Sequence, residues 1–560
     1  MTDTTRCEKQ ETLLEISNKI SKEYISSVLL VDDHIAFDPQ DGDDSTIDAG
    51  NFINDLARHR ITVCPYLWNK EGQLDNIIQL TDNSDVSIFD WKIQLQDHYS
   101  ETGLDSDVED SGDRGKNAKI LLQSIIKQNT ASPHLVIIYT EEPTEVQEYL
   151  LSLYKSYQYS ELLENHHVWI SPQKNIRISL FFKNSLSNTH GIKESRVIHN
   201  STEMITAIIS EFAELHKGIV PLSLLHSLSI LRQNTSKLLS VFNEDLDPAF
   251  ILHKALSSDP TDGDALLLQT FLDAFSALFF YQNRERFDCD NLVQAWFDDN
   301  SAQLSEGLFS AHVKKYPKVD LKIGHAERKE WLKTGYFSFL KTKISEQLSS
   351  GDSTRIDEVR RATEEWIKSR DPYTEFLGKI EQCFVLQDAT KMNKSNADFA
   401  ILTHHKSIFA PTEGFIPVLL LGCIIRRKSN EEYFLCIQQS CDCLRITGER
   451  QFLFLPLSRV SEGSFDLILP ASENNEYVKL TVNHKTSYLL KTIVFRSHDG
   501  DDVVKANKDQ SDNYCFIDNQ NEEYVWCCDL KESFALHFLN EYVHALTRVG
   551  VDQSEWLRRS

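Results

Sequence analysis

The stretch DVSIFDWKIQ (residues 85–94) contains the feature that decides the fold prediction. An apolar run from Val86 to Phe89 has the length of one buried β-strand, and it ends directly at Asp90. A buried carboxylate is costly unless it is paired with a cation or bound to a metal. The carboxylate therefore raises the question of whether neighbouring strands bring further charged groups to the same place.

Short apolar runs alternate with helical patterns over the first third of the chain. Strands are predicted at residues 28–31, 61–63, 86–89, 135–138 and 176–182, and helices at 13–24, 53–57, 74–80, 118–127 and 144–157. This alternation predicts a parallel sheet that is covered by helices on both faces. Two acidic stretches, residues 38–48 and 96–116, interrupt the pattern and are interpreted as solvated loops or disordered insertions.

Charged and hydroxyl side chains stand at the carboxyl ends of the predicted strands. They are Asp32 and Asp33 after SSVLLV, Asp90 after VSIF, Thr140 after VIIY, and Lys183 after RISLFF. Ligands of open parallel sheets bind beyond the carboxyl ends of the strands, so we expect these side chains to lie together. Clustered carboxylates favour a divalent cation such as Mg²⁺. An aspartate neutralised in this way can accept a phosphoryl group, whose oxygens a lysine and a hydroxyl can hold.

The motifs VLLVDD, SIFDWK, VIIYT and FFK occur in this order, each at a predicted strand end. They resemble the receiver domain of two-component response regulators over about residues 20–195. The resemblance implies a flavodoxin-like, doubly wound sheet in which Asp90 is the phosphoacceptor, Thr140 the switch hydroxyl and Lys183 the contact to the phosphoryl group. It also implies a Mg²⁺ site formed by Asp32, Asp33, Asp90 and the backbone carbonyl of Lys92.

The resemblance further implies a histidine kinase acting in trans as the phosphodonor. The chain contains no Gly-rich phosphate loop and nothing that resembles a kinase core. The only catalysis that the resemblance implies is the receiver's own phosphorylation and dephosphorylation. A divergent receiver of this kind is associated with bacterial defence.

Several positions depart from the receiver pattern. The loops around Asp90 and the interval from Thr140 to Lys183 are long. Asn184 follows the lysine where receivers usually have proline, and Leu180 occupies the usual position of the switch aromatic residue. These departures concern the Thr–aromatic switch more than the phosphoacceptor itself.

Two other hypotheses use the same residues. One is a degenerate receiver that is never phosphorylated and serves as a protein-binding scaffold. The other is a Mg²⁺-dependent nuclease, because Asp90-Trp91-Lys92 has the acid-x-Lys spacing that restriction-type nucleases place beside a strand. The nuclease hypothesis leaves Thr140 and Lys183 without a role.

The remaining two thirds of the chain carry weaker signals. We predict a receiver-like domain at residues 1–196, a helical domain or connector at 197–395, and a β-rich domain with a C-terminal helix at 396–560. LLLQTFLDAFSALFF (266–280) is apolar on nearly all sides, which predicts a buried helix. Short β-branched or aromatic runs between residues 415 and 495 predict an antiparallel barrel or sandwich. No output activity is indicated, although either region could bind a protein partner.

A second candidate site lies in QQSCDCLRI (438–446). Cys441 and Cys443, with His404 and His405 upstream, could ligate a metal or supply a nucleophilic thiol. In a strand the two thiols would face the same side, as core residues do. A role beyond packing therefore stays open at this stage.

Composition limits the classes of partner. The 560-residue chain has a formal net charge of −26, which disfavours broad nucleic-acid or anionic-membrane binding. Its longest apolar run, Phe415 to Ile425, is far shorter than the roughly 20 residues of a membrane helix. The N-terminal segment is polar and lacks a signal-peptide core. We therefore expect a cytoplasmic protein with no membrane contact, for which nucleic acid is an improbable partner.

Overall fold

The computed structural model describes most of the chain in seventeen segments. These are residues 11–36, 47–70, 72–95, 115–128, 133–183, 193–256, 261–286, 289–304, 306–349, 355–370, 376–384, 389–406, 414–461, 465–470, 477–482, 490–497 and 502–547. The described parts form two compact units, one of residues 1–303 with 325–334 and one of residues 304–324 with 335–560. One boundary between the units along the chain falls directly before Gly335, whose φ of 78° interrupts helix α11 (His325–Ser349).

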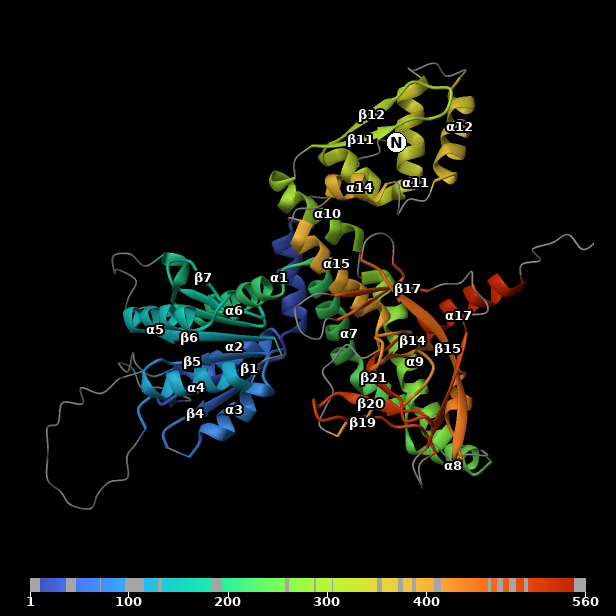
Figure 1. The fold of residues 1–560 in the computed structure, drawn as a ribbon. Coiled ribbons are helices and arrows are strands. Elements are labelled where there is room, and N and C mark those ends of the chain that lie inside the picture. The colour runs from blue at the N-terminus through green and yellow to red at the C-terminus, as the bar shows by residue number, and fades with distance from the viewer. Residues whose placement is uncertain are drawn as a thin grey trace, which may run out of the picture. The chain divides into compact units, whose positions relative to one another are not determined.

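The first unit is built on a sheet that confirms the predicted α/β fold (Figure 1). Among the described residues, five of its parallel strands follow the order β4-β1-β5-β6-β9, which is the doubly wound order of flavodoxin-like sheets. Their bounds are β1 (Ser27–Asp32), β4 (Thr62–Leu67), β5 (Val86–Phe89), β6 (His134–Thr140) and β9 (Ile176–Lys183). Each predicted strand of this region lies within one residue of an observed strand at its start, and most of the observed strands extend further.

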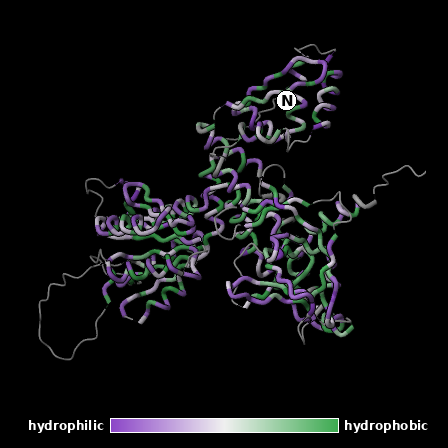
Figure 2. Tube along the Cα trace, in the orientation of Figure 1, coloured by the Kyte–Doolittle hydropathy of each residue, from purple (hydrophilic) through white to green (hydrophobic). Residues whose placement is uncertain are grey.

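Helices cover both faces of this sheet because the strands are apolar on both sides. On one face, Leu29, Val31 and Phe89 pack in a core with α3 (Leu74–Asp82), α4 (Lys116–Gln128) and α5 (Pro143–Ser156). On the other face, Leu30 and Ile88 pack with α1 (Leu13–Tyr24), α2 (Ala49–Arg58), α6 (Ser201–Leu215) and α7 (Ile219–Val241). Figure 2 shows hydrophobic residues along these strands, as expected for strands buried on both faces.

Short strands that the sequence pattern did not reveal complete the sheet. A hairpin of β7 (Glu161–Leu163) and β8 (Val168–Ile170) adds antiparallel strands beside β9, and β10 (Val197–Ile198) pairs with the end of β9. A separate pair is formed by β2 (Ile35–Ala36) and β3 (Ile47–Asp48). Most of the two predicted acidic loops lies outside the described residues, as does Asn184.

The rest of the first unit is helical. It contains α8 (Asp247–Leu256), α9 (Thr261–Arg286) and α10 (Cys289–Asn300). Helix α9 includes the predicted 266–280 helix, but the prediction that this helix is buried is wrong. Leu268 is 60% exposed and Leu272 is 49% exposed, because the described part of the chain places no core against this side of the helix.

The second unit combines helices with an antiparallel sheet. Its first part holds the hairpin of β11 (Gly307–Ala311) and β12 (Val319–Ile323), the second half of α11, α12 (Ile356–Lys368), α14 (Leu377–Phe384) and α15 (Ala389–His404). The hairpin was not predicted within this helical region. The β-rich region begins later than expected, since α15 continues to His404 and the first strand of the sheet starts at Cys423.

In the part of the chain that the structure describes, the antiparallel sheet has nine strands, and it confirms the predicted β-rich fold. They are β13 (Cys423–Arg427), β14 (Tyr433–Cys436), β15 (Glu449–Arg459), β16 (Leu467–Leu469), β17 (Val478–Val482), β18 (Lys491–Arg496), β19 (Asn507–Lys508), β20 (Tyr514–Ile517) and β21 (Glu523–Asp529). A bridge between Phe495 and Asp518 joins β18 to β20, so the sheet curls back on itself around an aromatic core. The terminal helix α17 (Glu532–Thr547) packs Phe538 and Tyr542 on the outer face.

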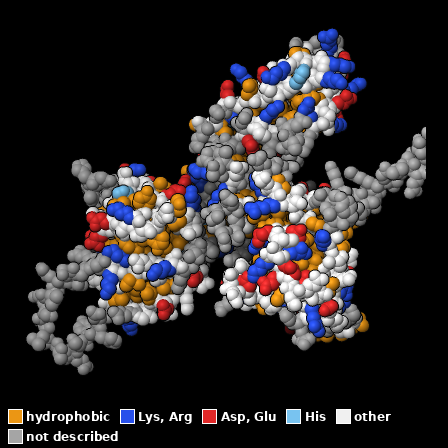
Figure 3. All heavy atoms as spheres, in the orientation of Figure 1, with side chains coloured by type: hydrophobic (Ala, Val, Ile, Leu, Met, Phe, Trp, Pro, Cys, Tyr) orange, Lys and Arg blue, Asp and Glu red, His pale blue; other side chains and the backbone are white. Residues whose placement is uncertain are grey.

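Among the described residues, no helix is both long enough and apolar enough to cross a membrane. The visible surface of the chain is a mixture of charged and hydrophobic side chains (Figure 3).

Candidate functional site

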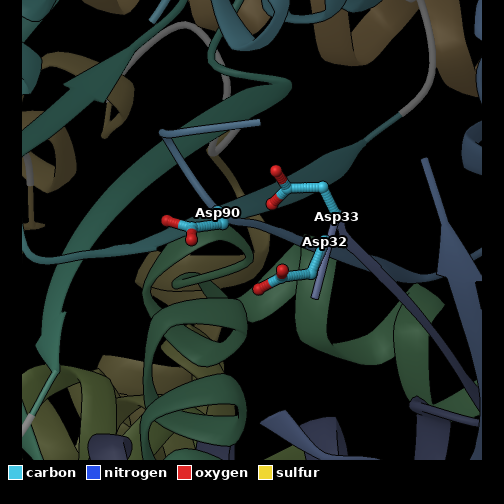
Figure 4. A group of neighbouring side chains, drawn as sticks. All are labelled: Asp32, Asp33 and Asp90. Atoms are coloured by element: carbon cyan, nitrogen blue, oxygen red, sulfur yellow. The ribbon is translucent and has the colours of Figure 1, made fainter. Parts of the chain in front are cut away.

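Three aspartates from two neighbouring strands meet at the carboxyl edge of the parallel sheet. Asp32 is the last residue of β1, Asp33 follows it, and Asp90 directly follows β5, which pairs with β1. One oxygen of each carboxylate can be chosen so that all three lie within 4.8 Å of one another. Figure 4 shows the three side chains gathered at these strand ends. The sequence therefore predicted their convergence correctly.

Lys183 supplies the cation that the buried carboxylates require. Its Nζ lies 3.0 Å from Oδ2 of Asp90, and both side chains are largely buried. The ammonium also lies over the ring of Tyr139, 5.8 Å from its centroid. Lys183 closes β9, two strands away from β5, so only the sheet topology brings it to Asp90.

Several carboxylate oxygens are held by backbone donors. The N–H of His34 donates to Oδ1 of Asp32 at 2.7 Å, and the N–H of Gln94 donates to Oδ2 of Asp33 at 2.7 Å. The backbone N–H groups of Trp91 and Lys92 favour the charged form of Asp90 and so act to lower its pKa. These bonds fix the orientation of the side chains and leave other oxygens available.

Two buried oxygens of the cluster have no hydrogen-bond partner. They are Oδ2 of Asp32 and Oδ1 of Asp33, and Asp32 is only 1% exposed. Unpaired buried carboxylate oxygens are rare because their desolvation is not compensated. Mg²⁺ binds oxygen ligands at about 2.1 Å, so opposite ligands lie roughly 4.2 Å apart, and the separation of the three carboxylates is compatible with that geometry. The donor set fits such an ion.

The electrostatics of the cluster also favour a cation. Burial, together with the neighbouring charge of Asp90, raises the pKa of Asp32 to about 7. Burial raises the pKa of Asp90 as well, although Lys183 opposes that effect. For Lys183, burial acts to lower the pKa, but the charges of Asp90 and Asp32 outweigh it and the net pKa is raised. Three carboxylates against one ammonium leave negative charge for a divalent ion to neutralise.

Thr140 lies at the end of β6, between β5 and β9 in the sheet. Its side chain is fully buried and its hydroxyl accepts a hydrogen bond from the N–H of Glu142 at 3.0 Å. Lys92 has an exposed side chain, and the predicted role of its backbone carbonyl as a metal ligand stays a prediction. The predicted site residues thus share one sheet edge.

Residues next to the predicted ones complete the surroundings of the site. Trp91 is fully buried, and its Nε1 donates to Oε2 of Glu145 on α5 at 3.2 Å. A Cβ added to Gly115 would lie 2.3 Å from the Trp91 ring, so the backbone directly before α4 packs closely against the indole. Trp91 and Tyr139 are each next in sequence to a predicted site residue, which is a signal that they lie near the site. The spacing of residues along the sequence does not predict the contact of Trp91 with Glu145 or that of Tyr139 with Lys183.

The second candidate site is not assembled in the described structure. Residues 440–443 form the short helix α16 and not a strand, so Cys441 is exposed whereas Cys443 is buried. His405 is buried and its Nε2 hydrogen-bonds to the carbonyl of Ile468, and the ring of His404 stacks on Phe534. Among the described residues, the only group of three or more acidic, His or Cys ligands is the Asp32–Asp33–Asp90 cluster.

Comparison with known families agrees with this geometry. Residues 24–187 match the family model described as a response receiver domain. This segment is a receiver domain. The match does not extend to residues 188–560, and no curated protein and no solved structure matches the chain. The receiver domain therefore carries an acidic cluster of the kind that binds Mg²⁺ in such domains.

Proposed function

We propose that the protein is a signalling protein whose receiver domain accepts a phosphoryl group on Asp90, with Mg²⁺ bound by Asp32, Asp33, Asp90 and the carbonyl of Lys92. The proposal rests on one observation: Asp90 lies 3.0 Å from Lys183 and beside two aspartates whose buried oxygens lack partners. The histidine kinase that supplies the phosphate would be a separate protein. The regions after the receiver domain would provide the output, which in a bacterium could serve defence.

The residues of the site have distinct roles in this proposal. The Asp90 oxygen attacks the phosphorus of the donor, and the bond from phosphorus to the donor nitrogen breaks. Lys183 then moves from a carboxylate partner to a phosphoryl oxygen, while Asp32 and Asp33 hold the metal that reduces repulsion between the anions. The hydroxyl of Thr140 can donate to another phosphoryl oxygen. Mg²⁺ supplies charge neutralisation at this step.

The test uses the full chain and a small phosphodonor such as acetyl phosphate, with and without Mg²⁺. Intact-mass measurement should show one added phosphoryl group in the wild type, and reduction of the acyl phosphate with borohydride, followed by peptide mapping of the alcohol formed, should place it on Asp90. We expect Asp90→Asn to abolish the added mass. Asp82→Asn, on the exposed side of α3, is the matched control and should be labelled like the wild type.

The two alternative hypotheses predict different outcomes of the same experiment. A folded wild type that takes up no phosphate would contradict the proposal and favour a scaffold. Mg²⁺-dependent cleavage of nucleic acid, lost in Asp90→Asn and Lys92→Ala together, would favour the nuclease. Lys183→Gln distinguishes the cases further, because the receiver mechanism requires this lysine and the acid-x-Lys arrangement does not.

A further inference from the structure

The helical end of the first unit exposes an unusual amount of apolar surface. Between Leu239 and Phe275 there are ten large hydrophobic side chains that are 38% to 77% exposed, out of 29 such side chains in the described residues. They lie on the end of α7, on the 3-10 turn Glu244–Leu246, on α8 and on α9. Figure 2 shows hydrophobic residues at the place of α8 in Figure 1. We call this region the helical apolar surface.

The helical apolar surface has almost no core of its own. Asn234 is the last buried side chain of α7, and α8 has none. In the described part of α9, only Gly263 is buried. A helix that is apolar on nearly all sides is normally buried, and contiguous apolar patches of this size mark interaction sites. The apolar sequence of α9 therefore predicts that this helix packs against another surface, and the described part of the chain provides no such surface.

The three helices nevertheless form a defined platform. The rings of Phe242 and Phe271 pack edge to face with centroids 4.8 Å apart, which joins the end of α7 to α9. Lys254 on α8 forms a 2.6 Å ion pair with Asp264 on α9. Between α7 and α9 lies a groove of about 340 Å³ that includes the small side chains of Ala274 and Ala277. Such a groove can accept side chains from an opposing helix.

We infer that the helical apolar surface pairs with the same surface of a second copy of this chain. The combined exposed area of these ten side chains, each 38% to 77% exposed, is comparable to the about 800 Å² per partner that a standard stable interface buries. A two-fold dimer buries the same patch on both subunits, which is the commonest form of assembly. The contact would place α7 and α9 of both copies in one helical bundle.

The charges around the surface allow this pairing in spite of the overall charge of −26. Lys237 lines the groove between α7 and α9, the pair of Lys254 and Asp264 joins α8 to α9, and Asp273 lies exposed on α9. In a two-fold contact a residue of one copy faces a different residue of the other, so opposite charges can meet across the interface. Asp90 is not part of the helical apolar surface. The Asp90→Asn variant should therefore associate as the wild type does.

The experiment is a measurement of molar mass by light scattering on the full-length protein. The wild type should have twice the 64.4 kDa mass of the chain. Leu268→Glu with Leu272→Glu should raise the dissociation constant by about 100-fold or more, because the interface would bury unpaired carboxylates. Leu308→Glu, a residue 53% exposed on β11 in the other unit, is the matched control and should leave the mass unchanged.

Cross-linking of a mixture of ¹⁴N- and ¹⁵N-labelled protein provides a second readout. Mixed-isotope links between Lys237 and Lys254 should appear in the wild type and disappear in the double variant. Circular dichroism checks that the variant is folded, and Leu252→Glu on α8 replaces it if it is not. A wild type with the mass of one chain would overturn the inference and assign the surface to another partner or to another part of the same chain. The inference would also be overturned if the dimer stayed intact in both the Leu268→Glu/Leu272→Glu double variant and Leu252→Glu.

Discussion

The two ends of strand β5 carry one aspartate each, and the two differ in how their oxygens are satisfied. At the amino end, Oδ2 of Asp85 accepts hydrogen bonds from the backbone and hydroxyl groups of Ser26 and Ser27, and Arg232 lies 2.8 Å from Oδ1. At the carboxyl end, the cluster around Asp90 retains two buried oxygens without a partner. Both ends are acidic and largely buried, but among the described residues only the carboxyl end retains buried carboxylate oxygens without a hydrogen-bond donor.

This difference separates a structural carboxylate from a candidate site. Asp85 ties β1, β5 and α7 together, and Arg232 also lies 4.1 Å over the ring of Tyr24. Its charge is compensated by the fold itself. At the other end, Lys183 pairs with Asp90, but one ammonium does not compensate the three charges of Asp32, Asp33 and Asp90, so the folded state is short of positive charge at that edge. A ligand can therefore stabilise the second end and not the first.

The largest effect on stability is expected at the amino end of β5, where Asp85 is a structural carboxylate. Asp85→Ala removes the largely buried acceptor of several donors from Ser26, Ser27 and Arg232 and should lower the free energy of unfolding by about 3–5 kcal/mol. Urea denaturation of the full-length protein, followed by the signal of the first unit, measures the change. Asp82→Ala is the control and should stay within about 0.5 kcal/mol of the wild type. A loss below about 1 kcal/mol for Asp85→Ala would remove the contrast between the ends.

The second expected effect concerns pH at the amino end of the sheet. His134 is buried, its Nε2 lies 3.0 Å from the hydroxyl of Ser87, and burial lowers its pKa to about 4 from 6.5. The unfolded state therefore binds more protons between these values, so stability present above pH 6.5 is lost as pH falls towards 4. The shift corresponds to on the order of 3 kcal/mol.

Denaturation of His134→Gln and the wild type between pH 4 and 7 checks this prediction. The difference in unfolding free energy between the two should shrink or reverse as pH falls, because glutamine does not titrate. His312→Gln, at an exposed position, should follow the wild type at every pH. Parallel pH profiles for His134→Gln and the wild type would mean that His134 does not stay neutral in the folded state.

A smaller effect of opposite sign is expected at the carboxyl end. Asp32→Asn removes one of three clustered charges and keeps an oxygen for the N–H of His34. Without divalent cations at pH 8, we expect the variant to be about 1–2 kcal/mol more stable than the wild type, since a buried unpaired charge is removed. Denaturation of both proteins in the presence of a chelator measures this difference in unfolding free energy. Destabilisation equal to that of Asp85→Ala would show that both ends are structural.

The smallest effect is stabilisation by the metal. Mg²⁺ at ten times its dissociation constant should raise the unfolding free energy of the wild type by about 1.4 kcal/mol. Asp32→Asn and Asp90→Asn should lose most of this increment, whereas Asp82→Asn should keep it. An increment that is equal in all four proteins would reflect general ionic screening and would contradict a specific site.

The sequence by itself predicted the parallel sheet and its acidic edge. Runs such as Val28–Val31 and Val86–Phe89 are too apolar for any place but a sheet covered on both faces, and each is followed by a charged residue. Because parallel strands end at the same edge, chain order alone indicated that Asp32, Asp33, Asp90 and Lys183 would converge. The local sequence pattern was sufficient to predict the positions of these site residues, because each of them lies at the end of a strand.

Only the tertiary structure decided the contacts made across the chain. The 3.0 Å pair of Lys183 with Asp90, the anchoring of Arg232 on Asp85 and the packing of Trp91 against Gly115 join residues that are far apart in sequence. The same limit explains the error at α9, where an apolar pattern predicts burial but does not say against what. Hydrophobicity is a property of the residues themselves, whereas a partner is supplied by the fold or by another molecule.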